Sequence, residues 1–260
     1  MNWFQQSFSW WCFQDRGVEA DALLSGAAKI GYSGVDLLDE SLWPAAQKCG
    51  LQISAVNGHS TFGLNRRENA AAIEKEIGIS IQKAEKWEIP VLVCFTGNRE
   101  GQADNLGLEI CAETLKRVAP LAENAGVKLA VELFNSKVDH ADYQGDSTAF
   151  GIRLCQAVGS PSVRLLYDIY HMQIMEGDII RTIQRDHEWF CHYHTAGNPG
   201  RSQPDETQEL YYPAIYRAIA STGYQKTVAH EFVPKINPLE ALEKAFRQCD
   251  SAHIAPAQLK

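Results

Sequence analysis

The sequence predicts an α/β protein, and the architecture that fits it best is a (β/α)8 barrel. Short β-rich runs alternate with longer helical patterns about eight times, which is typical of parallel strands joined by right-handed crossovers. The length of 260 residues suits one barrel, since such a barrel typically needs ~250 residues. The main alternative is an open doubly wound sheet. No Gly-x-Gly-x-x-Gly follows any predicted strand, so a dinucleotide fold has no support and we expect no organic cofactor.

The first half of the chain contains four strand–helix units. The runs GVDLL, ISAVNG and PVLVCF have the apolar and β-branched composition of buried strands. The longest helix is predicted because Ile73, Ile77, Ile81 and Ala84 recur at helical spacing. The expected strands are residues 4–9, 34–38, 53–58 and 90–95, and the expected helices are residues 21–30, 42–49, 67–87 and 106–125.

The second half repeats the pattern more clearly. The runs VKLAVELF, VRLLYDIY, WFCHYHT and KTVAHEFV read as strands, and Asp146 or Ser147 can cap the helix after the first of them. We find no low-complexity linker, so we expect residues 1–260 to form a single barrel domain. The expected strands are residues 127–134, 163–170, 189–195 and 226–233, and the expected helices are residues 147–158, 178–185, 212–222 and 238–249.

Composition excludes several classes of protein. The 24 Lys and Arg against 32 Asp and Glu give a formal charge of −8, which argues against nucleic-acid or anionic-membrane binding, because a phosphate footprint needs clustered cations. The seven cysteines are scattered without a CxxC, so we expect buried thiols in a reducing cytoplasm. The N-terminus does not read as a signal peptide, and no run approaches the ~20 apolar residues of a membrane helix.

A polar residue follows the apolar run in each of the last four predicted strands. These residues are Glu132, Asp168, His194 and Glu231. A charged side chain in such a run is unfavourable unless it is paired or bound to something. Because side chains alternate along a strand, the four groups can share the inner face, at the carboxyl ends where active sites of barrels lie. The pattern therefore predicts a common site.

Three carboxylates and one imidazole form a hard, oxygen-rich donor set. This set favours one divalent ion, Mn²⁺ or Mg²⁺ with Co²⁺ also compatible, over a thiolate-seeking metal. The ion would hold a carbonyl and its neighbouring hydroxyl and stabilise the enediolate that forms on proton loss. Glu132 and Glu231 come from non-adjacent strands and can flank that substrate. Our hypothesis is that both ligate the metal and also transfer the proton.

Other polar groups lie near the same strand ends. His171 follows Asp168 by three residues, and Arg201 lies in a polar Gly/Pro loop after the seventh strand. We expect both to contact the substrate, since an Arg at the barrel mouth can bind a carboxylate or a sugar hydroxyl. Four further residues lie at or after the ends of the first and third strands. They could line the pocket, although each taken alone reads better as a packing or capping group: Trp10, Trp11, Asn57 and His59.

The runs VELFN, LLYDIYHMQIMEGD, HYHTAGNPGR and AHEFVP, in this order, resemble the hydroxypyruvate isomerase family of the xylose-isomerase-like TIM barrels, which is close to the ketose 3-epimerases. The resemblance implies a (β/α)8 barrel with a divalent metal held by Glu132, Asp168, His194 and Glu231. It implies Glu132 and Glu231 as the proton-transfer pair. Hydroxypyruvate isomerases usually carry Gln where this chain has His194, and His there is typical of the sugar epimerases.

The leading expectation is an intramolecular isomerase that converts hydroxypyruvate to tartronate semialdehyde, with a small-molecule substrate and no nucleic-acid or membrane partner. The nearest alternative is epimerisation at carbon 3 of a ketose. A metal-dependent lyase or dehydratase on a sugar derivative would use the same enediolate. A phosphodiester endonuclease would need more His and a basic groove, and a non-catalytic barrel would be expected to lack at least one of the four ligands. The sequence leaves open whether the chain forms a homo-oligomer.

Overall fold

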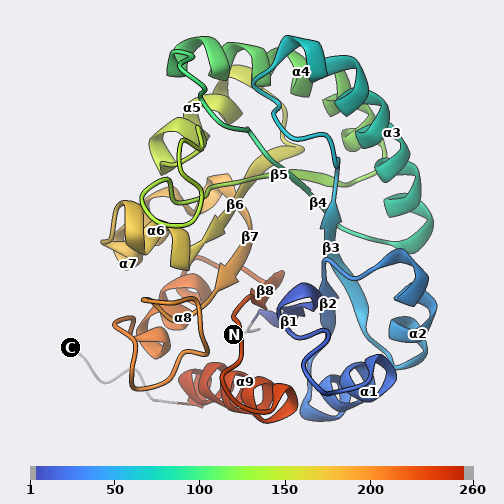
Figure 1. Ribbon diagram of the computed structural model, residues 1–260, viewed down its shortest axis with the longest axis vertical. Helices are drawn as coiled ribbons and strands as arrows, with labels where there is room; N and C mark the ends of the chain where they lie inside the picture. Colours follow the sequence, from blue (N-terminus) through green and yellow to red (C-terminus); the bar gives the residue numbers. More distant parts are fainter. Residues whose placement is uncertain (1–3, 255–260) are drawn as a thin grey trace. The chain divides into compact units, whose positions relative to one another are not determined.

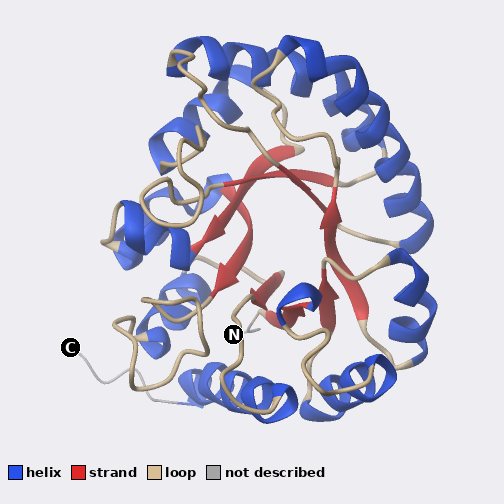
Figure 2. Ribbon diagram, viewed as in Figure 1, coloured by secondary structure: helices blue, strands red, loops and turns tan. Residues whose placement is uncertain are grey.

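The computed structural model describes residues 4–254, with side chains described to residue 252. Its strands form a closed barrel in which sequence order is also spatial order, and Figure 2 draws the strands in red. This confirms the (β/α)8 prediction and excludes the open doubly wound sheet. The strands are β1 Gln5–Ser9, β2 Gly34–Asp36, β3 Gln52–Asn57, β4 Val91–Cys94, β5 Lys128–Glu132, β6 Val163–Asp168, β7 Phe190–Thr195 and β8 Thr227–His230.

Helices follow the strands along the chain (Figure 1). They are α1 Ala20–Ile30, α2 Trp43–Lys48, α3 Ala70–Trp87, α4 Asp104–Asn124, α5 Thr148–Val158, α6 Ile169–Met175, α7 Ile179–Asp186, α8 Tyr212–Ser221 and α9 Pro238–Ile254. Sequence reasoning missed α6, and the prediction of a strand through Tyr170 is wrong. The reason is local: the Asp168 carboxylate accepts the backbone N–H groups of Tyr170 and His171 and starts a helix there.

Several predicted elements are longer than the observed ones. The strand predicted over residues 127–134 ends at Glu132, and the one predicted over 226–233 ends at His230. The helix predicted from Arg67 begins as a 3-10 turn over Arg67–Asn69 before α3. In the two strands the sequence pattern continues past the last ladder residue, so composition alone overestimates the length of the strand.

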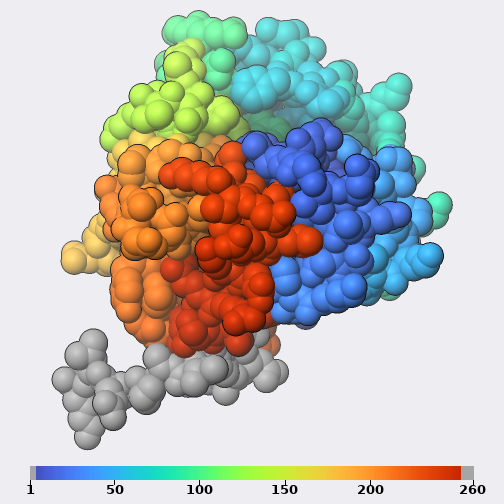
Figure 3. Space-filling model, turned by 60° about the horizontal axis from the view of Figure 1, so that its bottom comes forward, coloured from blue at the N-terminus to red at the C-terminus, as the bar shows by residue number. Residues whose placement is uncertain are grey.

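Contacts divide the chain into two compact units, and one comprises residues 1–52, 178–187 and 195–260. In this unit β1 pairs in parallel with β2 and with β8. Helix α9 packs on α1 and α8, so the beginning of the chain, in blue, lies beside its red end (Figure 3). Aromatic rings fill the core, with Phe8 edge-on to Phe13 and Tyr32 at centroid distances of 5.7 and 5.5 Å.

The other unit comprises residues 53–177 and 188–194. Strands β3 to β7 pair in parallel in sequence order. Helix α4 lies between α3 and α5 and packs on both. Helix α3 faces the core with the residues that predicted it: Ile73, Ile77, Ile81 and Ala84 are all buried. That residues 1–260 form a single domain stays a prediction.

Within residues 4–254, no helix is both long enough and apolar enough to cross a lipid bilayer.

The loop after β3 is tethered to α3 by one carboxylate. Glu76 accepts the backbone N–H groups of Ser60 and Thr61 at 2.6 and 2.9 Å and the Thr61 hydroxyl at 2.6 Å. Partial burial raises the pKa of Glu76, but the hydrogen bonds from Thr61 and Ser60 outweigh it and lower that pKa to about 2. The ionised carboxylate therefore holds this loop in place.

Glu76→Gln should lower the free energy of unfolding at pH 7 by about 1 kcal/mol, since these are hydrogen bonds to a charged but partly exposed group. The folded pKa lies below the ordinary value of 4.5. The stabilisation is therefore fully present above about pH 4.5 and is lost as the pH falls toward 2. Urea unfolding at pH 7, 5 and 3 measures this. Glu85→Gln, on the exposed side of the same helix, is the control. A difference between wild type and Glu76→Gln that does not shrink at pH 3 would contradict the assignment.

A close approach at α4 gives a second prediction. A Cβ on Gly107 would lie 1.9 Å from Oε1 of Gln144. Gln144 is fully buried, and its Oε1 accepts from Asn65 at 2.9 Å, so it cannot move without breaking that bond. Gly107→Ala should destabilise the protein by about 1–3 kcal/mol, although Ala is normally the better helix former.

Gly78, in α3, has open space around it, so Gly78→Ala should stabilise the protein by about 0.5–1 kcal/mol. Chemical denaturation compares the two, and equal signs would refute the steric argument.

Candidate active site

Three of the predicted metal ligands lie together at the carboxyl ends of neighbouring strands. Glu132 ends β5, Asp168 ends β6, and His194 is the penultimate residue of β7. Asp168 pairs in register with His194. The side chains are 3%, 1% and 0% exposed, and one ligand atom from each lies within 4.8 Å of the others. Nδ1 of His194 lies 3.3 Å from Oε1 of Glu132. The structure therefore brings three of the four predicted ligands to one place, and their binding of a metal stays a prediction.

Glu231, the fourth predicted ligand, lies directly after β8 in the other unit and is 3% exposed. Its backbone N–H donates to the Thr195 carbonyl at 2.9 Å. Both carboxylate oxygens have donors: the Trp11 indole N–H reaches Oε1 at 2.8 Å, and Arg201 Nη2 reaches Oε2 at 2.6 Å. The Arg201 guanidinium also lies over the Trp11 ring, 5.2 Å from its centroid. The carboxylate is thus held from two sides.

The backbone around Arg201 fixes where its guanidinium points. Val233 donates its N–H to the Arg201 carbonyl, and Gly197 donates to the Ser202 carbonyl, both at 2.7 Å. A Cβ on Gly197 would lie 2.9 Å from two backbone carbonyl oxygens, so only glycine fits this turn. Arg201 itself has φ of +52°, a conformation that is strained for a residue with a side chain. The strain accompanies the placement of its side chain on Glu231.

His171 lies on α6 and supports Asp168. Its Nδ1 accepts from the backbone N–H of Asn135 at 3.2 Å and lies 2.6 Å from the Asn135 amide nitrogen. The proton is therefore assigned to Nε2, which lies 3.6 Å from Oδ2 of Asp168. The His171 side chain is fully buried. Its predicted contact with substrate stays a prediction, and its observed partners are Asn135 and Asp168.

The predictions for the residues that follow β1 and β3 have different outcomes. His59 is 4% exposed, donates from Nδ1 to the Thr61 carbonyl at 2.7 Å and accepts the Phe95 N–H on Nε2 at 3.1 Å. This confirms its capping role, and burial lowers its pKa. Trp10 is buried at 3% exposure, which confirms it as a packing residue. Trp11 is 38% exposed and binds Glu231, so its interpretation as a packing group is incomplete. Its position just after the first strand is the feature of the sequence that indicates a place near the strand ends.

The arrangement can bind a hard divalent cation. Two buried carboxylates and one imidazole in the second unit offer the oxygen and nitrogen donors that Mn²⁺ and Mg²⁺ accept. Buried carboxylates are strongly unfavourable without compensating positive charge. The donor chemistry therefore fits the metal that the sequence predicted.

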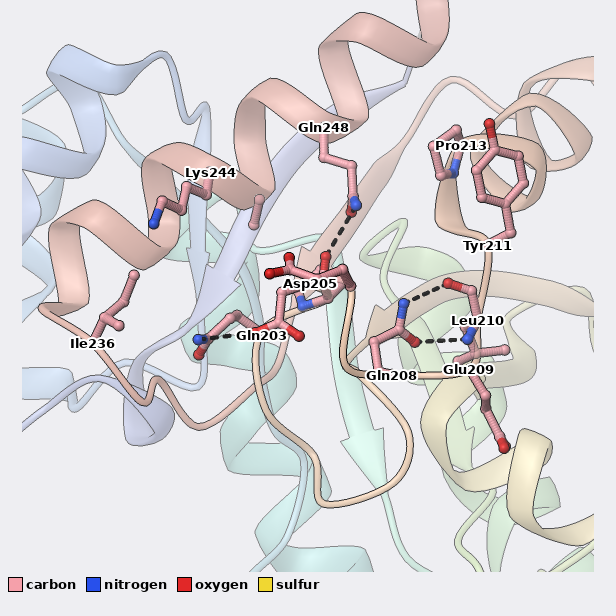
Figure 4. A pocket seen from close by; sticks show the side chains of 13 residues that line it. Gln203, Asp205, Gln208, Glu209, Leu210, Tyr211, Pro213, Ile236, Lys244 and Gln248 are labelled. Atoms are coloured by element: carbon pink, nitrogen blue, oxygen red, sulfur yellow. Dashed lines mark hydrogen bonds between the residues drawn. The ribbon is translucent and has the colours of Figure 1, made fainter.

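A surface pocket of about 710 Å³ lies elsewhere, between residues 203–213 and α9, and Figure 4 shows its lining. None of the six predicted site residues lines it. Its polar groups bind one another: Gln208 contacts both backbone groups of Leu210, Gln248 donates to the Pro204 carbonyl, and Asp205 accepts from Thr207. The pocket therefore lies between this loop and α9, and several of its polar groups already hydrogen-bond within the loop or between the loop and α9.

The chain is similar in sequence to a family model and to several known isomerases. A family model described as "Xylose isomerase-like TIM barrel" matches residues 19–251. A putative hydroxypyruvate isomerase of Homo sapiens is 23% identical over 257 residues, 92% of each chain. One of Danio rerio is 30% identical over 238 residues, 85% of this chain and 86% of that one. A 2-oxo-tetronate isomerase of Cupriavidus necator is 32% identical over 123 residues, 47% and 46% of the two chains.

Solved structures share the fold. A family 2 AP endonuclease of Brucella melitensis has a TM-score of 0.83 at 23% identity and covers 93% of this chain and 97% of its own. An L-ribulose 3-epimerase has a TM-score of 0.80 at 16% identity, with 99% and 100% covered. At these identities the likeness concerns the architecture of the barrel.

Proposed function

This chain belongs to the xylose isomerase-like TIM barrel family, and from that membership we propose that it is a metal-dependent isomerase of a small sugar acid. The proposed reaction converts hydroxypyruvate to tartronate semialdehyde. The likeness to putative hydroxypyruvate isomerases over most of the chain supports this choice. The main observation in favour of this reaction is the buried group of carboxylates and imidazole at the ends of β5, β6 and β7. Such a group suits a reaction that passes through a negatively charged enediolate.

In this proposal one divalent ion, Mn²⁺ or Mg²⁺, is held by Glu132, Asp168, His194 and Glu231. Glu231, the first residue after β8, is the fourth ligand that the sequence predicts. When bound, the ion supplies positive charge that stabilises developing negative charge on the substrate oxygens. His171, which is itself held by Asn135, orients Asp168, as partners of metal ligands commonly do.

Glu132 and Glu231 transfer the proton. One carboxylate takes a proton from carbon 3 of hydroxypyruvate, and the electron pair forms the enediolate. A proton is then added at carbon 2, while the proton on the carbon 3 oxygen passes to the carbon 2 oxygen, so the product is an isomer. The two glutamates come from strands that are not neighbours in the barrel, which suits groups that act on different sides of one substrate. Arg201, beside Glu231, is the group suited to the substrate carboxylate.

A second candidate is epimerisation at carbon 3 of a ketose. His194 favours it, since the sugar epimerases that this sequence resembles typically have His at that place. The same two glutamates would then remove and return a proton on opposite faces of one carbon. A lyase that expels a leaving group from the same enediolate is the remaining alternative.

Deuterium exchange separates these reactions. Protein loaded with Mn²⁺ or Mg²⁺ is incubated in D₂O with hydroxypyruvate and, separately, with D-fructose and D-tagatose, and the products are read by NMR. We expect deuterium in hydroxypyruvate together with an aldehyde product. Chelation of the metal should abolish the exchange, and added metal should restore it. Deuterium at carbon 3 of a ketose would instead establish the epimerase. Exchange in none of the substrates would contradict both and favour the lyase.

Glu231→Gln tests the assignment of the proton-transfer pair. Turnover should fall by about 10²–10⁴-fold, because the amide cannot accept the proton. Folding should survive, because Gln has nearly the same shape and carries no buried charge. Kinetic assays and thermal melts of the two proteins measure both effects. Glu206→Gln, on the exposed loop after β7, is the matched control and should behave as wild type. Near-normal turnover of Glu231→Gln would remove this residue from the mechanism.

A further inference from the structure

We propose that Trp11 is a positioning residue for Glu231: its indole N–H fixes one carboxylate oxygen, and its ring supports the guanidinium that binds the other. The inference rests on the proposed function only for its catalytic consequence. The contacts themselves, within one compact unit, are independent of any substrate.

The fold brings Trp11 to Glu231 by strand register. Strand β1 pairs with β8, with Phe8 opposite His230, so the residues that follow the two strands emerge side by side. After Ser9 the chain turns into a 3-10 helix over Trp10–Cys12. Its first residue, Trp10, is buried at 3% exposure, whereas Trp11 is 38% exposed. The two adjacent tryptophans therefore have different environments.

The geometry at Trp11 is that of a support for a charged group. An indole has a single N–H donor, and Trp11 uses it on Oε1 of Glu231 at 2.8 Å. Arg201 takes Oε2 at 2.6 Å and lies 5.2 Å from the Trp11 ring centroid. Hydrogen bonds to an ionised acceptor are stronger than neutral ones, and a cation over an indole face is attracted to it. Each of the three side chains contacts the other two, so rotation of the Glu231 carboxylate would break both bonds.

Burial alone does not account for this arrangement. A large aromatic side chain that is more than one-third exposed contributes less to the core than its buried neighbour Trp10. Its one polar atom is nevertheless directed at a buried carboxylate. The fixed orientation of the carboxylate is therefore what Trp11 provides, and orientation of a reacting group affects turnover more than substrate binding.

The first test needs neither metal nor substrate. Urea midpoints are measured for Trp11→Phe, for Glu231→Ala and for the double variant. Phe keeps an aromatic face for Arg201 and lacks the N–H. We expect the double variant to shift the midpoint by clearly less than the sum of the single shifts, because each single change breaks the same hydrogen bond. Trp10→Phe combined with Glu231→Ala is the control and should be additive. Additivity for Trp11 as well would overturn the proposal.

The second test measures the consequence for the site. Mn²⁺ affinity is measured by titration, and kcat and KM are measured with the substrate that shows deuterium exchange. We expect Trp11→Phe to weaken Mn²⁺ binding or kcat by about 10- to 100-fold, with KM changed much less and the protein still folded at the assay temperature. Trp11→Ala should be at least as impaired, and Trp10→Phe should keep the wild-type affinity.

The outcomes separate the two proposals. If Trp11→Phe equals wild type in affinity and kcat while Trp11→Ala is impaired, the ring acts by packing alone and the positioning role is refuted. If wild-type protein binds no Mn²⁺, the proposed metal function fails, whereas the urea cycle still decides whether Trp11 holds Glu231.

Discussion

A carboxylate buried at the end of a strand needs a hydrogen-bond donor or a cation, and this requirement explains how the segments after the strands are built. Asp168 is compensated by the first turn of α6 and by His171. Glu132 lies against His194, and Glu231 against Trp11 and Arg201. The partners of Asp168 and Glu231 come from the loops and helices that follow strands, whereas His194 lies within β7. The loops therefore differ because each one satisfies a different charge.

The two glutamates of the proposed proton-transfer pair have unlike surroundings. Glu132 lies beside the imidazole of His194. Glu231 lies beside a guanidinium and an indole, which can only donate hydrogen bonds to it. The two glutamates thus have neighbouring side chains of different chemical types. Such a difference is what a reaction needs when one group removes a proton and another delivers it.

The barrel and its polar strand ends could be predicted because both leave a local signal. A carboxylate in an apolar run, as in VELF or LLYD, is visible without knowledge of the neighbours. The role of Trp11 could not be found in this way, because its partner is 220 residues away. Helix α6 was missed for the opposite reason: the composition of LLYDIY favours a strand, and a single side-chain cap at Asp168 overrides it. Local composition therefore does not predict long-range hydrogen bonds or side-chain caps of helices.

At Arg201, backbone stability and the contact with Glu231 favour different residues. With φ of +52°, this position is one where glycine would relieve strain, so Arg201→Gly would be expected to relax the loop backbone. The same change would take the guanidinium from Glu231. Arginine at this position therefore combines a less favourable backbone conformation with the charge that pairs with Glu231.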